Sequence, residues 1–192
     1  MRADLKTLAT ESFDLLIVGA GIHGACAAWS AARMGLKTAL IDAGDFGGAA
    51  SANSLKVIHG GLRYLQHGNL KRMRESIRAR RRFLALAPKL VKPQPFAIPT
   101  RGAGVRGRAA LRVALALNDL ISADRNAGLD AAHRLPAGRL LSRSEAAQLW
   151  PSLPADAYDG AAAWCDALAH NTERLTRGVV LGARARGAGV VN

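Results

Sequence analysis

Six residues near the start of the 192-residue chain have the types and spacing of a phosphate-binding turn. They read Gly19-Ala20-Gly21-Ile22-His23-Gly24, a G-x-G-x-x-G pattern. The first glycine allows a tight turn, the second lets the backbone approach a pyrophosphate, and the third lets a helix pack closely on a strand. The amino terminus of that helix then stabilises the phosphate charge. Gly19, Gly21 and Gly24 are therefore predicted to hold a dinucleotide; a strand-to-helix turn without a ligand is the alternative.

The segments around this turn predict the strand, helix and strand that the chemistry needs. Residues 13–18 form a compact apolar run, typical of a strand buried on both faces of a parallel sheet. Residues 22–34 are rich in alanine, lack proline and are followed by Gly35, which indicates a helix with a glycine cap. A second strand is predicted at 37–41. Asp42 follows it, close to the roughly 20-residue offset at which an acidic side chain binds the adenosine ribose.

Composition and charge narrow the classes of protein without selecting a function. The chain is 49% hydrophobic and 21% charged, which argues against a disordered or collagen-like chain. Its net charge of +13 favours anionic partners, although a coding bias toward arginine explains it equally well. No nucleic-acid partner is predicted, because aromatic residues are scarce and no binding motif is present. Cys26 and Cys165 form neither a CxxC pair nor a ligand cluster, so no disulfide framework and no metal site are predicted.

The rest of the chain alternates loops with amphipathic segments. Residues 43–54 have a loop composition, and 69–87 keep a helical apolar period while arginines occupy the other faces. That basic face is either solvated or a contact for anionic lipid. The proline-rich stretch 88–107 is predicted to be a connection, with a short strand at 95–98 as an option. The remaining predictions are a helix at 109–121, a capping box of Ser142 with Glu145, a helix at 171–188 and the start of a strand at 188–192.

A second motif spans residues 51–65 and reads SANSLKVIHGGLRYL. This run resembles the flavin-proximal signature of the FAD-dependent, quinone-linked glycerol-3-phosphate dehydrogenases. Together with the glycine pattern, the resemblance covers residues 13–99. Residues 164–167 (WCDA) and 171–175 (NTERL) are also similar to the family's segment that leads into its next strand, whereas 100–160 is only loosely similar.

The resemblance implies an α/β fold, a Rossmann-like FAD-binding domain of a GR2-type flavoprotein with part of an inserted substrate or cap region. The expected domains are a first part of the FAD-binding domain at 1–100, a helical cap segment at 101–165, and an incomplete return to the FAD-binding domain at 166–192. Family members are much longer. We therefore expect a truncated chain that covers about the first two-fifths of one.

The resemblance also implies an activity, the oxidation of sn-glycerol 3-phosphate to dihydroxyacetone phosphate, with electrons passing through FAD to quinone. By position, the expected FAD-binding set adds six residues to the glycine turn and Asp42: Ser51, Ser54, Lys56, Gly60, Gly61 and the backbone of His59. Arg63 and Tyr64 would face the substrate, and His59 completes the catalytic set. An arginine fork suits a phosphate, and the flavin accepts the hydride. A turn-fixing His59 and a core-packing Tyr64 remain alternatives.

Two other functions stay open at this point. One is another FAD-dependent amine or hydroxy-acid oxidoreductase of the same fold, and the other is an inactive, truncated nucleotide-binding remnant. The electron acceptor is quinone or oxygen. No apolar run reaches the ~18 residues of a membrane span, and the first ten residues lack a secretory apolar core. We therefore expect a cytoplasmic protein, with peripheral attachment to the inner face of the cell membrane through an anionic surface as an option.

Overall fold

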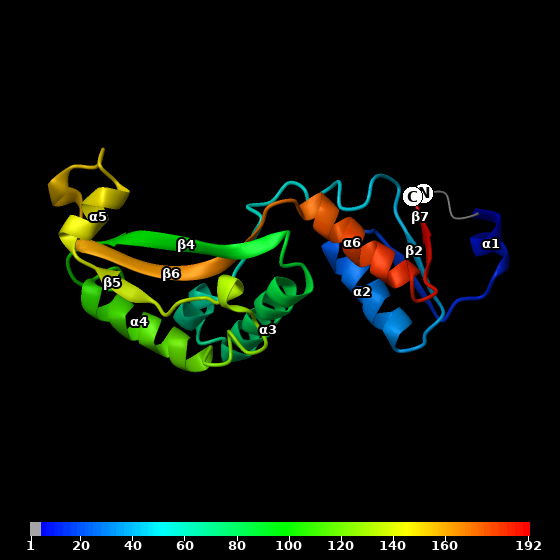
Figure 1. Ribbon diagram of the computed structural model, residues 1–192, viewed down its shortest axis with the longest axis horizontal. Helices are drawn as coiled ribbons and strands as arrows, with labels where there is room; N and C mark the ends of the chain where they lie inside the picture. Colours follow the sequence, from blue (N-terminus) through cyan, green and yellow to red (C-terminus); the bar gives the residue numbers. More distant parts are fainter. Residues whose placement is uncertain (1–4) are drawn as a thin grey trace. The chain divides into compact units, whose positions relative to one another are not determined.

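A computed structural model describes residues 5–192 of the chain, which forms two compact units (Figure 1). The first unit runs up to Lys56 and resumes at Ala169, and the second unit is Val57–Leu168. These boundaries differ from the expected divisions after residues 100 and 165. The reason is strand pairing, because the strands that follow Lys56 join the same sheet as residues 160–168.

The first unit is built on a three-stranded parallel sheet. Its strands are β1 (Leu15–Val18), β2 (Thr38–Ile41) and β7 (Gly189–Val191), in the order β1-β2-β7. Helix α2 (Ile22–Arg33) connects β1 to β2, and helix α6 (Thr172–Arg184) precedes β7; a short helix α1 (Leu5–Thr10) precedes the sheet. The predicted strand-helix-strand unit and the predicted last strand are thus confirmed.

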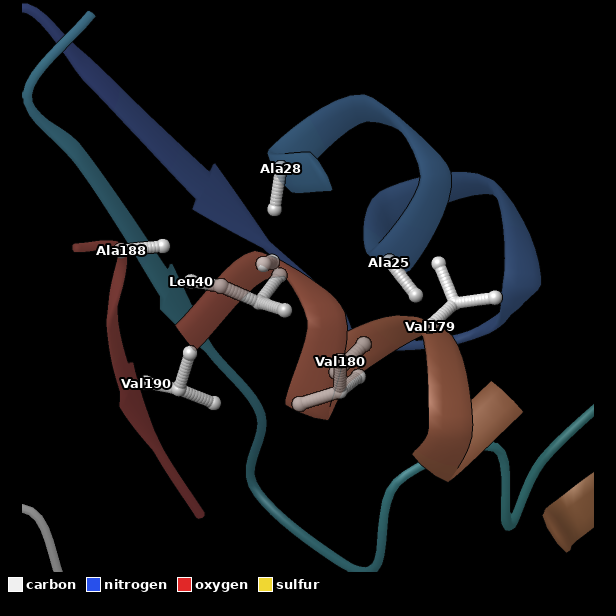
Figure 2. Packing of buried hydrophobic residues seen from close by; sticks show 9 residues of the cluster. Ala25, Ala28, Leu40, Val179, Val180, Ala188 and Val190 are labelled. Atoms are coloured by element: carbon white, nitrogen blue, oxygen red, sulfur yellow. The ribbon is translucent and has the colours of Figure 1, made fainter. Parts of the chain in front are cut away.

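The two long helices of this unit lie side by side over one face of the sheet (Figure 2). Ala25 of α2 points toward Val179 of α6, and Ala28 belongs to the same buried cluster as Leu40 and Val190 of the strands. Small alanine side chains let the helices approach each other closely, and close packing is what makes an interior stable. Leu40 is fully buried as a result.

Burial of β1 on both faces was predicted, and this prediction is wrong. Leu16 and Val18 are 59% and 76% exposed, whereas Ile17, which points the other way, packs against the helices. The difference from β2 has a simple cause. β1 lies at the edge of the sheet, and among the described residues both long helices cover the same face.

The second unit holds another sheet, in the order β3-β6-β4. Its strands are β3 (Val57–Ile58), β4 (Val91–Thr100) and β6 (Gly160–Ala169), and β5 (Arg139–Leu141) also pairs with β6. Helices α3 (Leu70–Leu86) and α4 (Arg108–Ile121) lie on one side of these strands (Figure 1). The shorter elements are the 3-10 helices η1 (Leu62–His67), η2 (Ala131–His133) and η3 (Ala155–Ala157), and helix α5 (Arg143–Leu149).

The ten-residue strand β4 replaces the connection that its prolines predicted. Pro93, Pro95 and Pro99 have the same parity along the strand. Their missing N–H groups therefore lie on one edge of it, and β4 is at the end of the β3-β6-β4 order. A strand at a sheet edge tolerates proline where no hydrogen bond is needed. The proline content pointed to a loop, but the placement of the three prolines at alternate positions is compatible with a strand.

The basic face of α3 is also less solvated than predicted. Arg74 and Arg81 both bind Asp124, with Nη1 to carboxylate oxygen distances of 2.6 and 2.9 Å. The hydrogen bond from Arg74 holds the pKa of Asp124 below its ordinary value. These contacts attach the segment after α4 to α3. No helix within residues 5–192 is long and apolar enough to cross a membrane.

The predicted capping box at α5 is confirmed and makes stability depend on pH. The Glu145 carboxylate accepts from the Ser142 backbone N–H at 2.7 Å, and Ser142 Oγ accepts from the Glu145 N–H at 3.2 Å. The Ser142 backbone N–H, then its hydroxyl and Arg139, lower the pKa of Glu145 from 4.5 to about 2.

A lowered pKa means that this contribution is present above pH 4.5 and disappears as the pH falls toward 2. Glu145→Gln should therefore lower the thermal unfolding midpoint at pH 7, and the difference from the unsubstituted protein should shrink as the solution is acidified. Midpoints measured by circular dichroism across this range test the prediction. An equal difference at pH 7 and near the acid end would contradict it.

Candidate functional site

The glycine turn between β1 and α2 has a steric reason for two of its glycines. Gly19 has a φ of +100°, which side-chain-bearing residues rarely adopt. A Cβ on Gly24 would overlap the carbonyl oxygen of Gly19 and would lie 3.3 Å from Cγ2 of Ile17. The absence of a side chain at Gly24 therefore lets α2 start directly against β1, with its amino terminus at the carboxyl end of the strand.

Ser51 lies at this helix amino terminus, although it is distant in the sequence. Its Oγ accepts the backbone N–H of Ile22 at 2.9 Å, and a Cβ on Gly21 would lie 3.2 Å from the same oxygen. Gly21 is the capping residue and has no side chain to offer, so the loop after β2 supplies the acceptor. Ser51 is thus a polar side chain at the end of α2 where an anion is stabilised.

Asp42 connects the end of β2 to the same turn. Its two carboxylate oxygens accept the backbone N–H groups of Ala20 at 2.5 Å and of Gly44 at 2.9 Å. A carboxylate offers about four acceptor positions, so two remain for hydroxyl donors. The structure therefore brings Asp42, Ser51 and the glycine turn together around the amino end of α2.

Ser54 and Lys56 lie farther along the same loop. Lys56 has a φ of 59°, uncommon for a residue with a side chain, and its N–H donates to Ser54 Oγ at 3.1 Å. The carbonyl oxygen of Lys56 accepts the N–H of Ala169 at 2.8 Å. These contacts fix the backbone where the chain leaves the first unit and where it returns.

A cavity of about 610 Å³ opens in the first unit beside the loop that follows Asp42. Its volume lies in the range of ligand sites, and its walls mix both charges. The lining residues are Asp45, Phe46, Glu173, Arg174, Arg177 and Asn192. Sequence reasoning missed this cavity, because its walls come from segments more than a hundred residues apart.

The predicted catalytic residues gather in the second unit. The rings of His59 and Tyr64 meet edge to face, with their centroids 5.9 Å apart. Arg63 lies on the 3-10 helix η1 and is exposed. Tyr64 is half-buried and lies against Gly61. Gly61 has a φ of +84° and is the residue that caps the start of η1. Arg63 is therefore free to reach a ligand, whereas Tyr64 also packs.

A buried ion pair under this segment was not predicted. Arg80 Nη1 binds Asp166 Oδ1, and the two side chains are 4% and 9% exposed. The Gly60 N–H donates to the same Asp166 oxygen at 2.6 Å. Sequence reasoning assigned Arg80 to the basic face of its helix. The available signal was its spacing, since it continues the apolar series of Met73 and Ile77 on α3.

Two further side chains lie in the glycine turn or in the helix that follows it. His23 is exposed within the turn. Cys26 packs against the core of the first unit, and burial raises the pKa of its thiol. Across residues 5–192, no three His, Cys, Asp or Glu side chains come together as metal ligands.

Comparisons with known proteins agree on one family. Residues 14–192 match the family DAO, described as FAD dependent oxidoreductase. The chain is 35% identical over 181 residues to a glycerol-3-phosphate dehydrogenase of Synechocystis sp., covering 94% of this chain and 31% of that protein. It is 33% identical over 198 residues to the mitochondrial glycerol-3-phosphate dehydrogenase of Rattus norvegicus, covering 99% of this chain and 26% of the other.

The fold has a solved counterpart. The glycerol-3-phosphate dehydrogenase of Bacillus halodurans, crystallised with FAD, superposes with a TM-score of 0.63 at 21% identity, over 97% of this chain and 27% of that one. The chain thus spans between a quarter and a third of these relatives, less than the two-fifths expected.

Gly24→Ala should displace α2 and weaken FAD binding, because the added methyl group overlaps the Gly19 backbone. We expect a loss of roughly 1–3 kcal/mol of stability, typical of overpacking. The control is Gly178→Ala in α6, where a Cβ meets open space and should stabilise the helix by roughly 0.5–1 kcal/mol. Denaturant unfolding and retained flavin measure both. Equal behaviour of the two variants would refute the packing argument.

Asp42→Ala should weaken FAD binding by about tenfold or more, because it removes a charged hydrogen-bond acceptor. Asp14→Ala is the control, since Asp14 is likewise an aspartate whose carboxylate accepts a backbone N–H, that of Lys37 at 2.8 Å, but at the amino ends of the strands. Fluorescence titration of apoprotein with FAD compares them. Equal weakening in both variants would remove Asp42 from the site.

Proposed function

The chain belongs to the FAD dependent oxidoreductase family, and from this premise we propose that it forms the FAD-binding part of a glycerol-3-phosphate dehydrogenase. The reaction is the oxidation of sn-glycerol 3-phosphate to dihydroxyacetone phosphate. The observation that carries the proposal is 35% identity to a glycerol-3-phosphate dehydrogenase over 94% of the chain. The chain spans 31% of that relative.

The residues of the first unit fit FAD. The amino terminus of α2 offers backbone N–H groups for the pyrophosphate, Gly21 leaves room for it, and Ser51 adds a hydroxyl. Asp42 keeps acceptor positions for the adenosine ribose. When bound, FAD supplies the two-electron acceptor that alcohol oxidation requires.

The second unit offers groups for the substrate. Arg63 is exposed, and its planar guanidinium suits a phosphate dianion through paired N–H donors. Oxidising a secondary alcohol removes a hydride from carbon and a proton from the hydroxyl oxygen. The imidazole of His59, in edge-to-face contact with the Tyr64 ring, is the proposed acceptor of that proton.

We further propose that electrons pass from the flavin to quinone, and that the protein is cytoplasmic and attaches peripherally to the inner face of the cell membrane. Support comes from α4, where Val113, Leu117 and Leu120 are exposed on one helical face. An exposed apolar stripe on an amphipathic helix suits a lipid surface, and the exposed Arg112 of α4 adds positive charge for anionic lipid. Release of the enzyme from membranes by high salt, with quinone reduction but no hydrogen peroxide, is the expected behaviour.

Anaerobic mixing of the full-length, FAD-loaded enzyme with substrates tests the reaction. The oxidised flavin absorbance should bleach with sn-glycerol 3-phosphate, and not with glycerol, lactate, glycine or proline. Arg63→Ala should raise the KM for glycerol 3-phosphate by about tenfold or more, since a charge-assisted contact is lost. Arg78→Ala, an exposed arginine on α3, is the control. Bleaching by an amine or a hydroxy acid alone would favour the alternative oxidoreductases.

A further inference from the structure

The ion pair of Arg80 and Asp166 lies directly under the turn that carries the candidate catalytic residues. Asp166 Oδ1 accepts from both Arg80 and the Gly60 N–H, and Asp166 Oδ2 accepts the indole N–H of Trp164 at 3.0 Å. Arg80 Nη1 also donates to the carbonyl oxygen of Cys165 at 3.2 Å. Both carboxylate oxygens therefore have partners, and both charges are compensated inside the unit.

Such a pair is a poor device for stability alone. Removing two charges from water is costly, and a well-packed apolar pair of similar volume often stabilises a fold equally well. An apolar pair, however, forms no directional hydrogen bonds to the backbone. The carboxylate of Asp166 holds one backbone N–H at one place, and the guanidinium fixes that carboxylate from the other side.

The glycines of the turn are shaped by the same helix. A Cβ on Gly60 would overlap the guanidinium of Arg80. A Cβ on Gly61 would lie 2.7 Å from Cδ2 of Tyr64 and 3.2 Å from Cα of Met73. The turn therefore runs in contact with α3 on this side. The guanidinium of Arg80 lies between the turn and the helix and therefore limits how closely they approach. His59 precedes the two glycines in the sequence, and Arg63 follows them.

We propose that Arg80 and Asp166 are positioning residues, which hold the His59-Gly60-Gly61 turn so that His59 and Arg63 are presented correctly to the substrate. The proposal rests on the function proposed above, because it concerns the same catalytic residues. Lysine cannot replace arginine here. Nη1 of Arg80 donates to both Asp166 and the Cys165 carbonyl oxygen, and the lysine ammonium, on a side chain one bond shorter, does not reach this position without moving the helix or the strand.

Arg80→Lys in the full-length, FAD-loaded enzyme is the main test, with Arg81→Lys as the matched control. Arg81 is the next residue of the helix, and its ion pair with Asp124 is partly exposed. Amide hydrogen exchange, flavin content, kcat and KM are measured in both. For Arg80→Lys we expect the amide hydrogens of residues 57–65 to exchange about tenfold faster or more, because a charged hydrogen bond is weakened. We expect kcat to fall by a similar factor. The glycine turn, Asp42 and Ser51 of the first unit are untouched, so the enzyme should still bind flavin, and kcat is calculated per bound flavin.

Three results would overturn the proposal. One is an Arg80→Lys enzyme whose kcat matches that of Arg81→Lys. Another is faster exchange spread evenly over α3, β4 and β6, which indicates a general loss of stability. The third concerns Trp164→Phe, which removes the indole donor to Asp166, keeps an aromatic ring beside Phe96 and decides the matter if Arg80→Lys does not fold. Its exchange should rise in residues 57–65, and unchanged exchange there would count against the pair.

The exchange measurement separates this proposal from the proposed function. It needs no substrate, so it reports on the turn even in an enzyme that glycerol 3-phosphate does not reduce. Faster exchange confined to residues 57–65, with no reaction of the unsubstituted enzyme with glycerol 3-phosphate, would reject the substrate and keep the positioning of the turn.

Discussion

The close approach of helix α2 to strand β1 is the constraint on which the first unit depends. It requires a glycine where the helix passes the Gly19 carbonyl oxygen, and it places the helix amino terminus at the carboxyl end of the sheet. Asp42 and Ser51 then reach this point from β2 and from the following loop. The alanine face of α2 allows α6 to pack beside it, so one sequence feature serves both the core and the site.

In the second unit, an ion pair holds the backbone next to the candidate catalytic residues. This unit's turn carries His59 and Arg63 at the surface. Functional residues on a loop are positioned by the rigid elements that the loop contacts. Here a strand from the far end of the unit supplies Asp166, and α3 supplies Arg80. The two glycines of the turn leave room for that helix. The arrangement keeps the polar groups of the site exposed while their backbone is held.

Sequence reasoning succeeded where local chemistry determines structure. The glycine turn, Asp42 after β2 and the capping box at Ser142 follow from neighbouring residues, and the structure has each in the predicted place. It failed where contacts between distant segments determine the structure. The prolines of β4 suggested a loop, because the partner that makes β4 an edge strand begins sixty residues later. Arg80 was misassigned for the same reason, since only the fold brings Asp166 to it.

FAD binding by the amino terminus of α2, with Asp42 and Ser51, underlies the function assigned to the first unit. A crystal structure of the full-length, FAD-loaded protein tests it most directly. If FAD binds there, its pyrophosphate lies at the backbone N–H groups that follow Gly21, beside Ser51, and its adenosine ribose hydroxyls lie on the Asp42 carboxylate. A flavin dinucleotide bound elsewhere, with the glycine turn empty and Asp42 bonded only to the backbone N–H groups of Ala20 and Gly44, would contradict it.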